Sequence, residues 1–382
     1  MNQQIGIIGF RKDAVLAAKA MGLDVILWSN KPLPKNLPDN IVASHTEPFP
    51  EFNENLSQAC IDFFNSYPNL ACYLALTEAS VPATALLEQH YKHQDNLKKL
   101  YICHDKYAMK IHAKEANIPV TRFTLCNEIK DIKTTLNEWQ LPLYAKPRGS
   151  SGSRDIRKIH DMQMFSLVKS ADFILEENIN GTEFSIEFFI YNKEIIFFNI
   201  TQYYVPLEIN IIPGPSNLVN IASIKHLMGK LVNAFDLNNT IVHMECFKTD
   251  LQILLGEFAI RPPGGYLMKA MELAYGFNLW QALIQIKLGQ SPNIGIMPSH
   301  HTASWVIHPN KKGTITKIDG IEAIRQLKST HAIYFKQHVN DFIEKRKGTG
   351  EDIGHIIFVA KNYHSLIDDV ESARQLLKIE IQ

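Results

Sequence analysis

Two apolar, strand-forming segments in the second half of the chain each contain one glutamate and are joined by a short polar turn. Glu245 lies within residues 241–247, and Glu257 lies within residues 252–260. Residues 248–250 between them are polar and turn-forming, so the pattern predicts a β-hairpin with an acid in each strand. Two carboxylates that meet in a sheet can hold Mg²⁺ against substrate phosphates, because this hard cation prefers oxygen ligands. The alternative is a pair of solvent-facing acids on an edge hairpin.

Two lysines upstream lie at positions that suit phosphate binding. Lys106 begins a predicted helix that runs to about residue 115. Lys146 ends a short predicted strand, and residues 147–153, which contain glycine and serine, follow it. Such a loop offers N–H groups and hydroxyls to phosphate, and the ammonium adds charge. An ordinary hairpin turn is the alternative for this loop.

A third segment has the character of a nucleotide-binding strand end. Residues 173–175 form a short predicted strand, and the polar residues 176–183 lead into a second strand. Polar groups at a strand end can read the edge of adenine, and Glu183, seven residues after Glu176, can accept hydrogen bonds from ribose hydroxyls. The alternative is an acidic connector between two strands.

Taken in order, these motifs resemble those of the ATP-grasp superfamily, and within it the chain is similar to carboxylate–amine ligases of the L-amino-acid ligase type. The architecture expected is biotin carboxylase-like, and the resemblance covers roughly residues 1 to 300. It implies that Lys106 and Lys146 contact the ATP phosphates and that Arg261 faces the transferred phosphate. Lys146 and Arg261 are thereby the expected catalytic residues.

The resemblance also implies a metal site and a nucleotide site. The metal ligands are Glu245 and Glu257, with Mg²⁺, or alternatively Mn²⁺, as the ion. The phosphate-covering loop comprises Ser150, Ser151, Gly152 and Ser153, the adenine hinge comprises Glu176, Glu177 and Ile179, and Glu183 binds ribose. Ala259 stands where relatives commonly have an asparagine that helps hold a second metal, so one-metal and two-metal sites both stay open.

Four further residues are candidates for substrate binding: Glu78, His243, Gly264 and Gly265. Glu78 follows a predicted strand of a parallel sheet, at the edge where such sheets bind ligands, although it also suits the start of a helix. His243 shares a strand face with Glu245 under the two-residue period of a strand. The glycine pair follows Arg261 and can help to stabilise an oxyanion.

The function implied by the resemblance is ATP-dependent formation of an amide from a small carboxylate and a small amine. The carboxylate is activated to an acyl phosphate, which the amine attacks, and ADP and phosphate are released. One alternative is a biotin carboxylase-like or purine-biosynthetic ATP-grasp enzyme that uses bicarbonate or formate. A second alternative is a degenerate nucleotide-binding regulatory module.

The predicted fold combines α/β and α+β parts. Residues 1–95 alternate strands and helices and predict a parallel α/β pre-ATP-grasp domain. Residues 96–300 are assigned to the ATP-grasp domain, and residues 301–382 to a small C-terminal α+β lobe. The first predicted turn lacks a GxGxxG motif, which disfavours a dinucleotide site.

Composition narrows the class of protein. The chain has 382 residues and 46% hydrophobic content, enough for sizeable cores. Lysine plus arginine and aspartate plus glutamate number 39 each, so neither nucleic acid nor a membrane is expected as a partner. The 5 cysteines show no CxxC spacing, which favours free thiols. With no signal-like or membrane-spanning segment, the sequence predicts a cytoplasmic enzyme, and a homodimer stays open.

Overall fold

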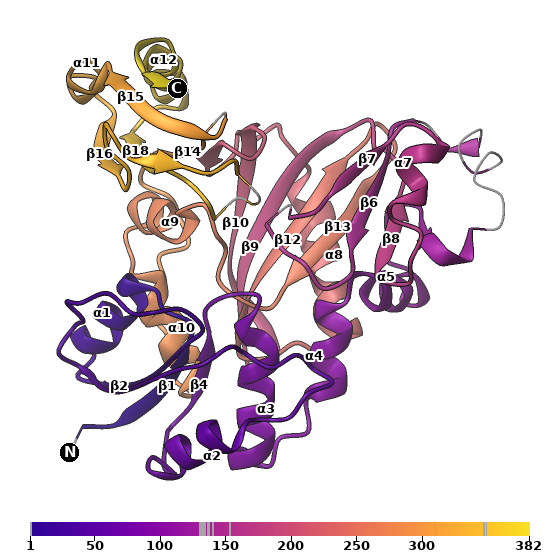
Figure 1. The fold of residues 1–382 in the computed structure, drawn as a ribbon, viewed down its shortest axis with the longest axis vertical. Coiled ribbons are helices and arrows are strands. Elements are labelled where there is room, and N and C mark those ends of the chain that lie inside the picture. Colours follow the sequence, from indigo (N-terminus) through magenta and orange to yellow (C-terminus); the bar gives the residue numbers. More distant parts are fainter. Residues whose placement is uncertain are drawn as a thin grey trace.

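The protein consists of three bodies arranged around a central opening (Figure 1). The computed structural model describes residues 2–129, 135, 138–139, 141–152, 154–309, 311–346, 348 and 350–382. In Figure 1 the N-terminal domain is at the lower left, the C-terminal lobe at the upper left, and the central domain extends to the right. This arrangement confirms the mixed α/β and α+β class that the sequence predicts.

The N-terminal domain is a parallel sheet covered by helices on both faces. Its strands are β1 (Gln4–Ile8), β2 (Asp24–Ser29), β3 (Ile41–Thr46) and β4 (Tyr73–Ala75), in the order β3-β2-β1-β4. Its helices are α1 (Lys12–Ala20), α2 (Gln58–Asn65) and α3 (Ser80–Lys92). Strands β1 and β2 are buried almost throughout, since Ile5 and Ile7 pack into one hydrophobic cluster and Ile8 packs into another on the opposite face, whereas β3 at the sheet edge is partly exposed.

The central domain is an antiparallel sheet that continues into the C-terminal lobe. Its strands follow the order β13-β12-β9-β10-β11-β14-β18-β16. They are β9 (Thr182–Tyr191), β10 (Glu194–Val205), β11 (Ile209–Ile212), β12 (Thr240–Lys248), β13 (Ile253–Ala259), β14 (His301–Ile307), β16 (Thr330–Phe335) and β18 (Gly354–Ala360). Because β11 pairs with β14, the sheet is unbroken across residue 300, where the sequence pattern predicts a boundary.

A smaller sheet stands beside the central one and carries the predicted phosphate loop. Its strands are β5 (Phe123–Leu125), β6 (Leu143–Pro147), β7 (Arg157–Ile159) and β8 (Phe173–Glu176), in the order β5-β8-β6-β7. The 3-10 helix η1 (Cys126–Glu128) and helix α7 (Met162–Ser166) accompany it. Helices α4 (Leu97–His104) and α5 (Lys106–Glu115) connect the N-terminal domain to this region.

The C-terminal lobe packs helices against the far end of the long sheet. A second sheet has the order β17-β15-β19, formed by β15 (Gly313–Asp319), β17 (Phe342–Ile343) and β19 (Lys378–Ile381). Helices α11 (Ile321–Arg325) and α12 (Tyr363–Leu376) complete the lobe. Ile209 and Ile211 of β11 belong to the same hydrophobic cluster as the lobe, so the lobe and the central sheet share a core.

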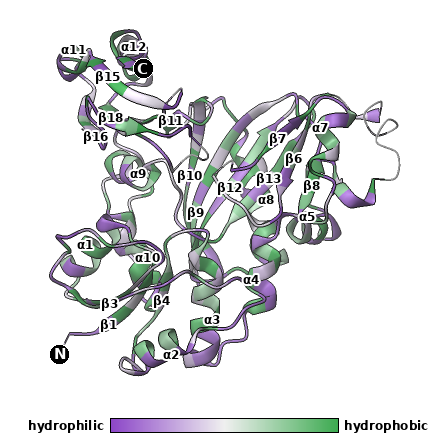
Figure 2. Cartoon of the chain, viewed as in Figure 1, coloured by the Kyte–Doolittle hydropathy of each residue, from purple (hydrophilic) through white to green (hydrophobic). Residues whose placement is uncertain are grey.

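Three further helices cover the central sheet or join it to the N-terminal domain. Helix α8 (Ile221–Ala234) is amphipathic and buries its apolar stripe against the central sheet. Helices α9 (Leu267–Tyr275) and α10 (Leu279–Lys287) pack into the cluster of the N-terminal sheet and α1. Figure 2 shows hydrophobic residues concentrated where these elements meet. Among the described residues, no helix combines the length and apolar character that a membrane crossing requires.

The packing of α8 gives a test of the fold. Leu231 is fully buried on its inner face, whereas Ile221 at its start is 44% exposed. Leu231→Ala should lower the free energy of unfolding by about 2 to 5 kcal/mol, because it removes buried methyl groups and leaves a cavity. Ile221→Ala is the matched control and should have a much smaller effect. Urea denaturation of both variants measures the difference, and equal losses would contradict this packing.

Candidate active site

The predicted acidic hairpin is present, and its two glutamates face each other. Glu245 of β12 and Glu257 of β13 are Cα partners in the antiparallel ladder, and a bulge lies between Glu245 and Cys246. Met244 and Cys246 on either side of Glu245 are fully buried, whereas the Glu245 and Glu257 side chains are 30% and 27% exposed. The two carboxylates therefore share one accessible face of the sheet.

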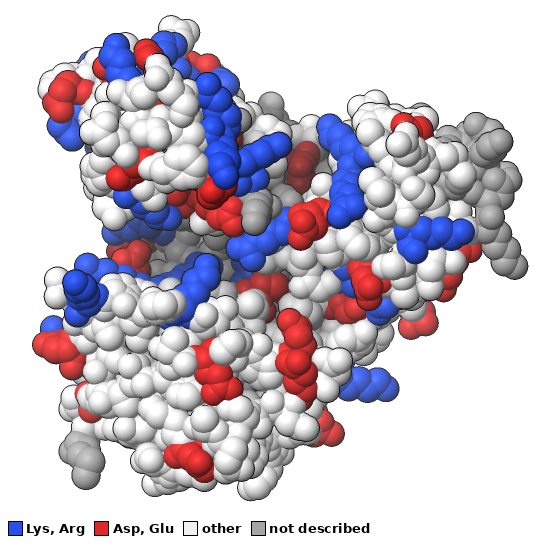
Figure 3. Space-filling model, in the orientation of Figure 1, with Lys and Arg blue, Asp and Glu red and all other residues white. Residues whose placement is uncertain are grey.

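This face lines a cavity of about 360 Å³ where the three bodies meet. Figure 3 shows lysine and arginine side chains gathered around the hollow between the bodies. The cavity includes most of the residues predicted for the site: Glu78, Lys106, Lys146, Ser150, Ser151, Gly152, Glu183, His243, Glu245, Glu257, Arg261, Gly264 and Gly265. Ser153 lies outside the described residues.

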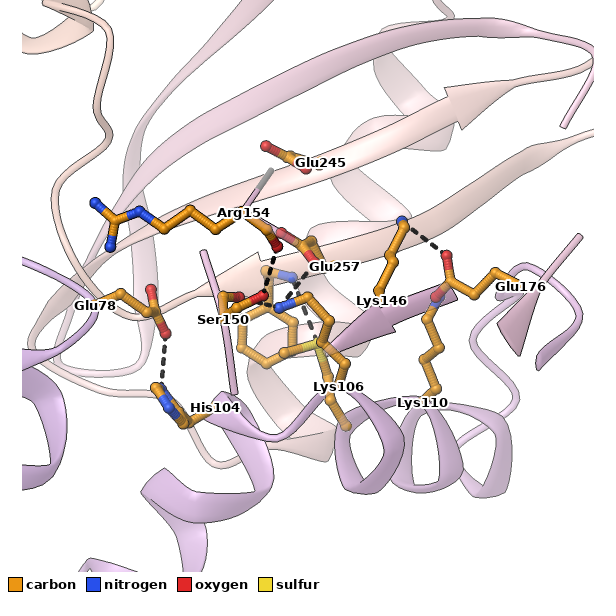
Figure 4. Close-up of polar contacts among 12 residues, drawn as sticks. Glu78, His104, Lys106, Lys110, Lys146, Ser150, Arg154, Glu176, Glu245 and Glu257 are labelled. Carbon is orange, nitrogen blue, oxygen red and sulfur yellow. Dashed lines mark hydrogen bonds and ion pairs between the residues drawn. The ribbon is translucent and has the colours of Figure 1, made fainter. Parts of the chain in front are cut away.

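Lys106 connects the phosphate loop to the hairpin. It is the first residue of α5, where the Asp105 side chain caps the helix by accepting a hydrogen bond from the Ala108 N–H at 2.9 Å. The Lys106 ammonium donates to the backbone carbonyl of Ser150 and lies 3.4 Å from a carboxylate oxygen of Glu257. Figure 4 shows Lys106 between these two groups. One cation therefore reaches both the loop and one of the paired acids.

Glu176 is engaged by two lysines in the protein interior. Its carboxylate lies 2.8 Å from the Lys146 ammonium and 2.9 Å from that of Lys110, and only 3% of the residue is exposed (Figure 4). Burial opposes the charge of Glu176, but the two lysines outweigh it and lower its pKa to about 2. Burial lowers the pKa of Lys110. Glu176 thus fixes Lys146 at the cavity wall.

The adenine hinge expected from the sequence lies apart from the cavity wall. Glu176, Glu177 and Ile179 are not among the described residues that line this cavity. Glu177 instead accepts a hydrogen bond from the backbone N–H of Arg122 at 2.8 Å. The Glu176 carboxylate is held by lysines, so the role of these three residues as an adenine hinge stays a prediction.

Glu183 faces the cavity from β9, next to the acidic pair. Burial first, and then the negative charge of Glu245, raise the pKa of Glu183 to about 7. The acidic pair and Glu183 therefore concentrate negative charge on this part of the cavity wall.

Behind Glu245, a buried chain of hydrogen bonds runs through the sheet. His243 Nδ1 lies 2.9 Å from Glu187 Oε1, and His243 Nε2 lies 3.5 Å from Glu245 Oε1. Burial disfavours the charged imidazole, but its hydrogen bonds and the charges of the two glutamates raise the pKa of His243 to about 9. The imidazolium thus bridges Glu187 and Glu245, and His243 orients a predicted metal ligand.

Glu187, at the far end of this series of hydrogen bonds, accepts hydrogen bonds from several donors. It is 1% exposed and accepts hydrogen bonds from the hydroxyls of Ser185 at 2.7 Å and Thr201 at 2.6 Å. The Asn199 amide donates to it at 2.9 Å, and the Tyr275 hydroxyl in turn donates to Asn199 at 3.0 Å. A carboxylate with this many donors keeps one orientation, so His243 does too.

Glu78 links the N-terminal domain to Arg261, which follows the hairpin of β12 and β13. Its carboxylate lies 2.9 Å from His104 Nδ1 and accepts a hydrogen bond from Arg261 Nε at 2.8 Å. Despite burial, these partners lower the pKa of Glu78 to about 2.

The turn after Arg261 passes through Gly265 at a φ of +59°, where the Ser304 hydroxyl donates to its carbonyl at 2.5 Å.

Two family models match separate parts of the chain. Residues 149–269 match the family model described as ATP-grasp domain, and residues 305–382 match L-amino acid ligase C-terminal domain 2. The chain contains an ATP-grasp domain. The resemblance inferred from the sequence is thereby confirmed.

One curated protein is similar to this chain in sequence, and solved structures share its fold. The L-arginine-specific L-amino acid ligase of Bacillus subtilis is 24% identical over 278 residues, which is 68% of this chain and 67% of that protein. The crystal structure of the L-amino acid ligase from Bacillus licheniformis superimposes with a TM-score of 0.81 at 19% identity, covering 100% of this chain and 99% of that one. N5-carboxyaminoimidazole ribonucleotide synthetase from Thermotoga maritima gives a TM-score of 0.75 at 20% identity, with 100% of both chains covered.

The paired acids of this ATP-grasp domain fit a magnesium ion. Within the described segments, no three histidine, cysteine, aspartate or glutamate side chains cluster as a complete metal site. Glu245 and Glu257 nevertheless stand in register and face the cavity, and Mg²⁺ commonly takes one or two carboxylates together with substrate phosphates. The donor set therefore suits a metal that arrives with a nucleotide.

Sequence reasoning missed several residues of the site. They are Arg11, His104, Lys110, Arg154, Glu187 and Tyr203, of which Lys110 and Glu187 lie behind the cavity wall and the others line it. Lys110 follows Lys106 by four residues, the spacing that places both on one helix face, and this signal was available. Glu187 sits two residues after Ser185 on β9, and only the pairing with β12 reveals its partner.

We expect that removing one lysine of the pair around Glu176 lowers the stability of the fold. Lys110→Met should lower the free energy of unfolding by about 3 kcal/mol, because it leaves a buried carboxylate with one cation. Lys193→Met, which breaks an exposed ion pair with Asp236, is the control and should change stability little. Chemical denaturation compares the two. Unchanged stability in Lys110→Met would mean that Lys146 alone satisfies Glu176.

The hydrogen-bond network around His243 and Glu187 leads to a second prediction, which concerns metal binding. Glu187→Gln should raise the Mg²⁺ concentration needed for half-maximal nucleotide turnover by about 10- to 100-fold, because an outer partner orients the ligand that touches the metal. Tyr275→Phe removes only the outermost hydrogen bond of the same network and serves as the control. A Glu187→Gln protein with lower thermal stability but wild-type Mg²⁺ dependence would reduce this chain to a structural role.

Proposed function

We propose that this protein is an ATP-dependent carboxylate–amine ligase that forms an amide through an acyl phosphate and releases ADP and phosphate. The observation that carries the proposal is the cavity in which Glu245 and Glu257 stand opposite each other with Lys106, Lys146 and Arg261 around them. Paired carboxylates and three cations in one cavity suit the binding of a metal-bound triphosphate and the transfer of its terminal phosphate.

In the proposed reaction an oxygen of the substrate carboxylate attacks the γ-phosphorus, and the bond from that phosphorus to the β-γ bridging oxygen breaks. ADP leaves with that electron pair. The amine nitrogen then attacks the acyl carbon, the carbon–oxygen bond to phosphate breaks, and the nitrogen loses a proton. No protein side chain becomes covalently attached at any step.

The residues would act mainly by position and charge. Glu245 and Glu257 would hold Mg²⁺, which supplies positive charge against the β- and γ-phosphates when bound. Lys146, fixed by Glu176, and Lys106, fixed by the Ser150 carbonyl, would contact phosphate oxygens. Arg261 would oppose the charge on the transferred phosphate, and the N–H groups of the following turn would face the acyl oxygen. In this arrangement most of the catalysis would come from charged and polar groups that are already in position before the reaction.

The C-terminal lobe favours an amino-acid substrate over a purine precursor. Structures of purine-biosynthetic synthetases share this fold, but likeness at 20% identity or less concerns the fold alone. Residues 305–382, in contrast, match a domain described for L-amino acid ligases, and Val306 of this segment lines the cavity. We therefore place amino acids or similar small carboxylates first among the substrates, in an enzyme of the cytoplasm that uses Mg²⁺ or Mn²⁺.

Nucleotide products and one metal-ligand variant test the proposal together. Incubation with ATP, Mg²⁺ and a matrix of amino acids should yield ADP and phosphate together with products whose mass is the sum of two substrates less water. Glu257→Gln keeps the shape of the side chain but removes a ligand charge, so turnover should fall by a factor of about 100 or more with an unchanged thermal melt. Chromatography of the nucleotides and mass spectrometry of the products provide the readouts.

Two outcomes would contradict the proposal. AMP and pyrophosphate as the main nucleotide products would place the attack on the α-phosphate and exclude an acyl phosphate. If the protein bound ATP but turned it over with no pair of amino acids, the alternative of a degenerate nucleotide-binding regulatory module would be favoured instead.

A further inference from the structure

A second cavity, of about 380 Å³, lies between the N-terminal domain and the central domain. Its wall is formed by β4 and α3 of the N-terminal domain, by α10, by the start of β12 and by the segment that follows β13. Neither Glu245 nor Glu257 lines it, whereas Arg261 lines both cavities. Its volume is in the range of pockets that hold small molecules.

Strand β4 presents an open edge to this cavity. It is the last strand of its sheet and pairs with β1 alone, where the Cys72 carbonyl accepts a hydrogen bond from the Gly6 N–H at 2.9 Å. Because successive residues of a strand direct their peptide groups to opposite sides, those of Tyr73 and Ala75 point away from β1. Both residues line the cavity, and within the described part of the chain nothing hydrogen-bonds to their N–H and C=O groups. These groups are therefore free to pair with a ligand.

Charged groups of both signs line the same cavity beside β4. Glu88 and Lys92 lie one turn apart on α3, and Lys287 is the last residue of α10. Burial raises the pKa of the Cys72 thiol to about 12, and the charges of these three residues also act on it, so all of them stand near this thiol. The Lys92 ammonium donates to the Leu70 carbonyl, whereas the charged groups of Lys287 and Glu88 have no hydrogen-bond or ion-pair partner within the described residues. Two ammonium groups and a carboxylate suit a ligand that carries a carboxylate and an ammonium of its own.

We propose that this cavity is a second binding site, which holds a dipeptide with free termini alongside β4 and lowers turnover when it is occupied. The inference rests on the proposed ligase function, since a dipeptide is the product expected from two amino acids. In an extended dipeptide the N–H of the second residue and the carboxylate lie on the same side, so both can pair with the open peptide groups of Tyr73 and Ala75, as an added strand does. Lys92 and Lys287 balance the carboxylate, and Glu88 balances the ammonium.

The site adjoins two segments that position a pair of residues in the proposed active site. Glu78 follows the end of β4 by three residues, and Ile260 and Pro262, which line the second cavity, flank Arg261. Arg261 donates a hydrogen bond to Glu78 at 2.8 Å. A dipeptide along β4 contacts both segments and is therefore placed to shift this pair without entering the cavity of Glu245 and Glu257.

Calorimetric titration tests the site directly. The probes are dialanine, its C-terminal amide, dialanine methylated on the peptide nitrogen, and any dipeptide found among the reaction products. The proteins are the wild type, Lys287→Met and, as a control, Lys98→Met, which removes an exposed cation of α4 that does not line the cavity.

We expect Lys287→Met to weaken dipeptide binding by about 10- to 100-fold, because it removes a charge-assisted contact, and Lys98→Met to bind as the wild type does. The amide and the methylated peptide should bind the wild type more weakly than dialanine, since one lacks the carboxylate and the other lacks the N–H that pairs with β4. Equal binding of dialanine by the wild type and Lys287→Met would overturn the site, and so would a wild type that binds none of these dipeptides.

Turnover, measured as ADP release at increasing dipeptide concentration, tests the effect on the active site. We expect the dipeptide to lower kcat of the wild type and leave the KM for the amino acids unchanged, and to have a much smaller effect on Lys287→Met. Inhibition that competes with the amino acids equally in both proteins would overturn this effect, and so would unchanged turnover at saturating dipeptide. Failure of the ligase function itself gives a different result: the wild type forms no amide from any pair of amino acids, while the titrations still decide whether the second site binds a dipeptide.

Discussion

The antiparallel pairing of β12 with β9 on one side and β13 on the other is the constraint on which the site depends. It sets Glu245 opposite Glu257, and it sets His243 opposite Glu187. Because a one-residue slip would turn every side chain to the other face, the fully buried Met244 and Cys246 also fix which face carries the acids. Packing of the core thereby decides where the charges stand.

Several buried charged groups of the site lie between partners that they can bond to, and these contacts make their burial tolerable. Glu176 lies between two lysines, Glu78 lies between His104 and Arg261, and His243 lies between two glutamates. A buried charge without a partner is costly, so these groups hold each other in place before any nucleotide binds. Preorganisation of this kind reduces the rearrangement needed when phosphate charge moves during a reaction.

The sequence alone was sufficient to predict features that depend on local signals, such as turn residues and helix-capping residues. The hairpin and the start of α5 at Lys106 follow from such signals, and the structure confirms both. It was insufficient where contacts join distant segments: Arg11 and Pro263 are 252 residues apart, and Arg261 and Glu78 are 183 apart. Nor does local sequence reveal that Glu176 turns toward lysines, because their position depends on α5 packing beside β6 and β8.

The site divides its tasks between rigid and peripheral parts of the molecule. Glu245 lies on β12 and Glu257 on the edge strand β13, and Glu187 on β9, which holds His243 beside Glu245, accepts hydrogen bonds from several buried donors. Arg11 and Glu78 come from the N-terminal domain, and Val306 and Gly350 come from the C-terminal lobe. Changes in these outer bodies can alter which small molecules enter without disturbing the hairpin. Under the proposed function, the fold thus separates phosphate chemistry at the hairpin from recognition of the substrates by the outer bodies.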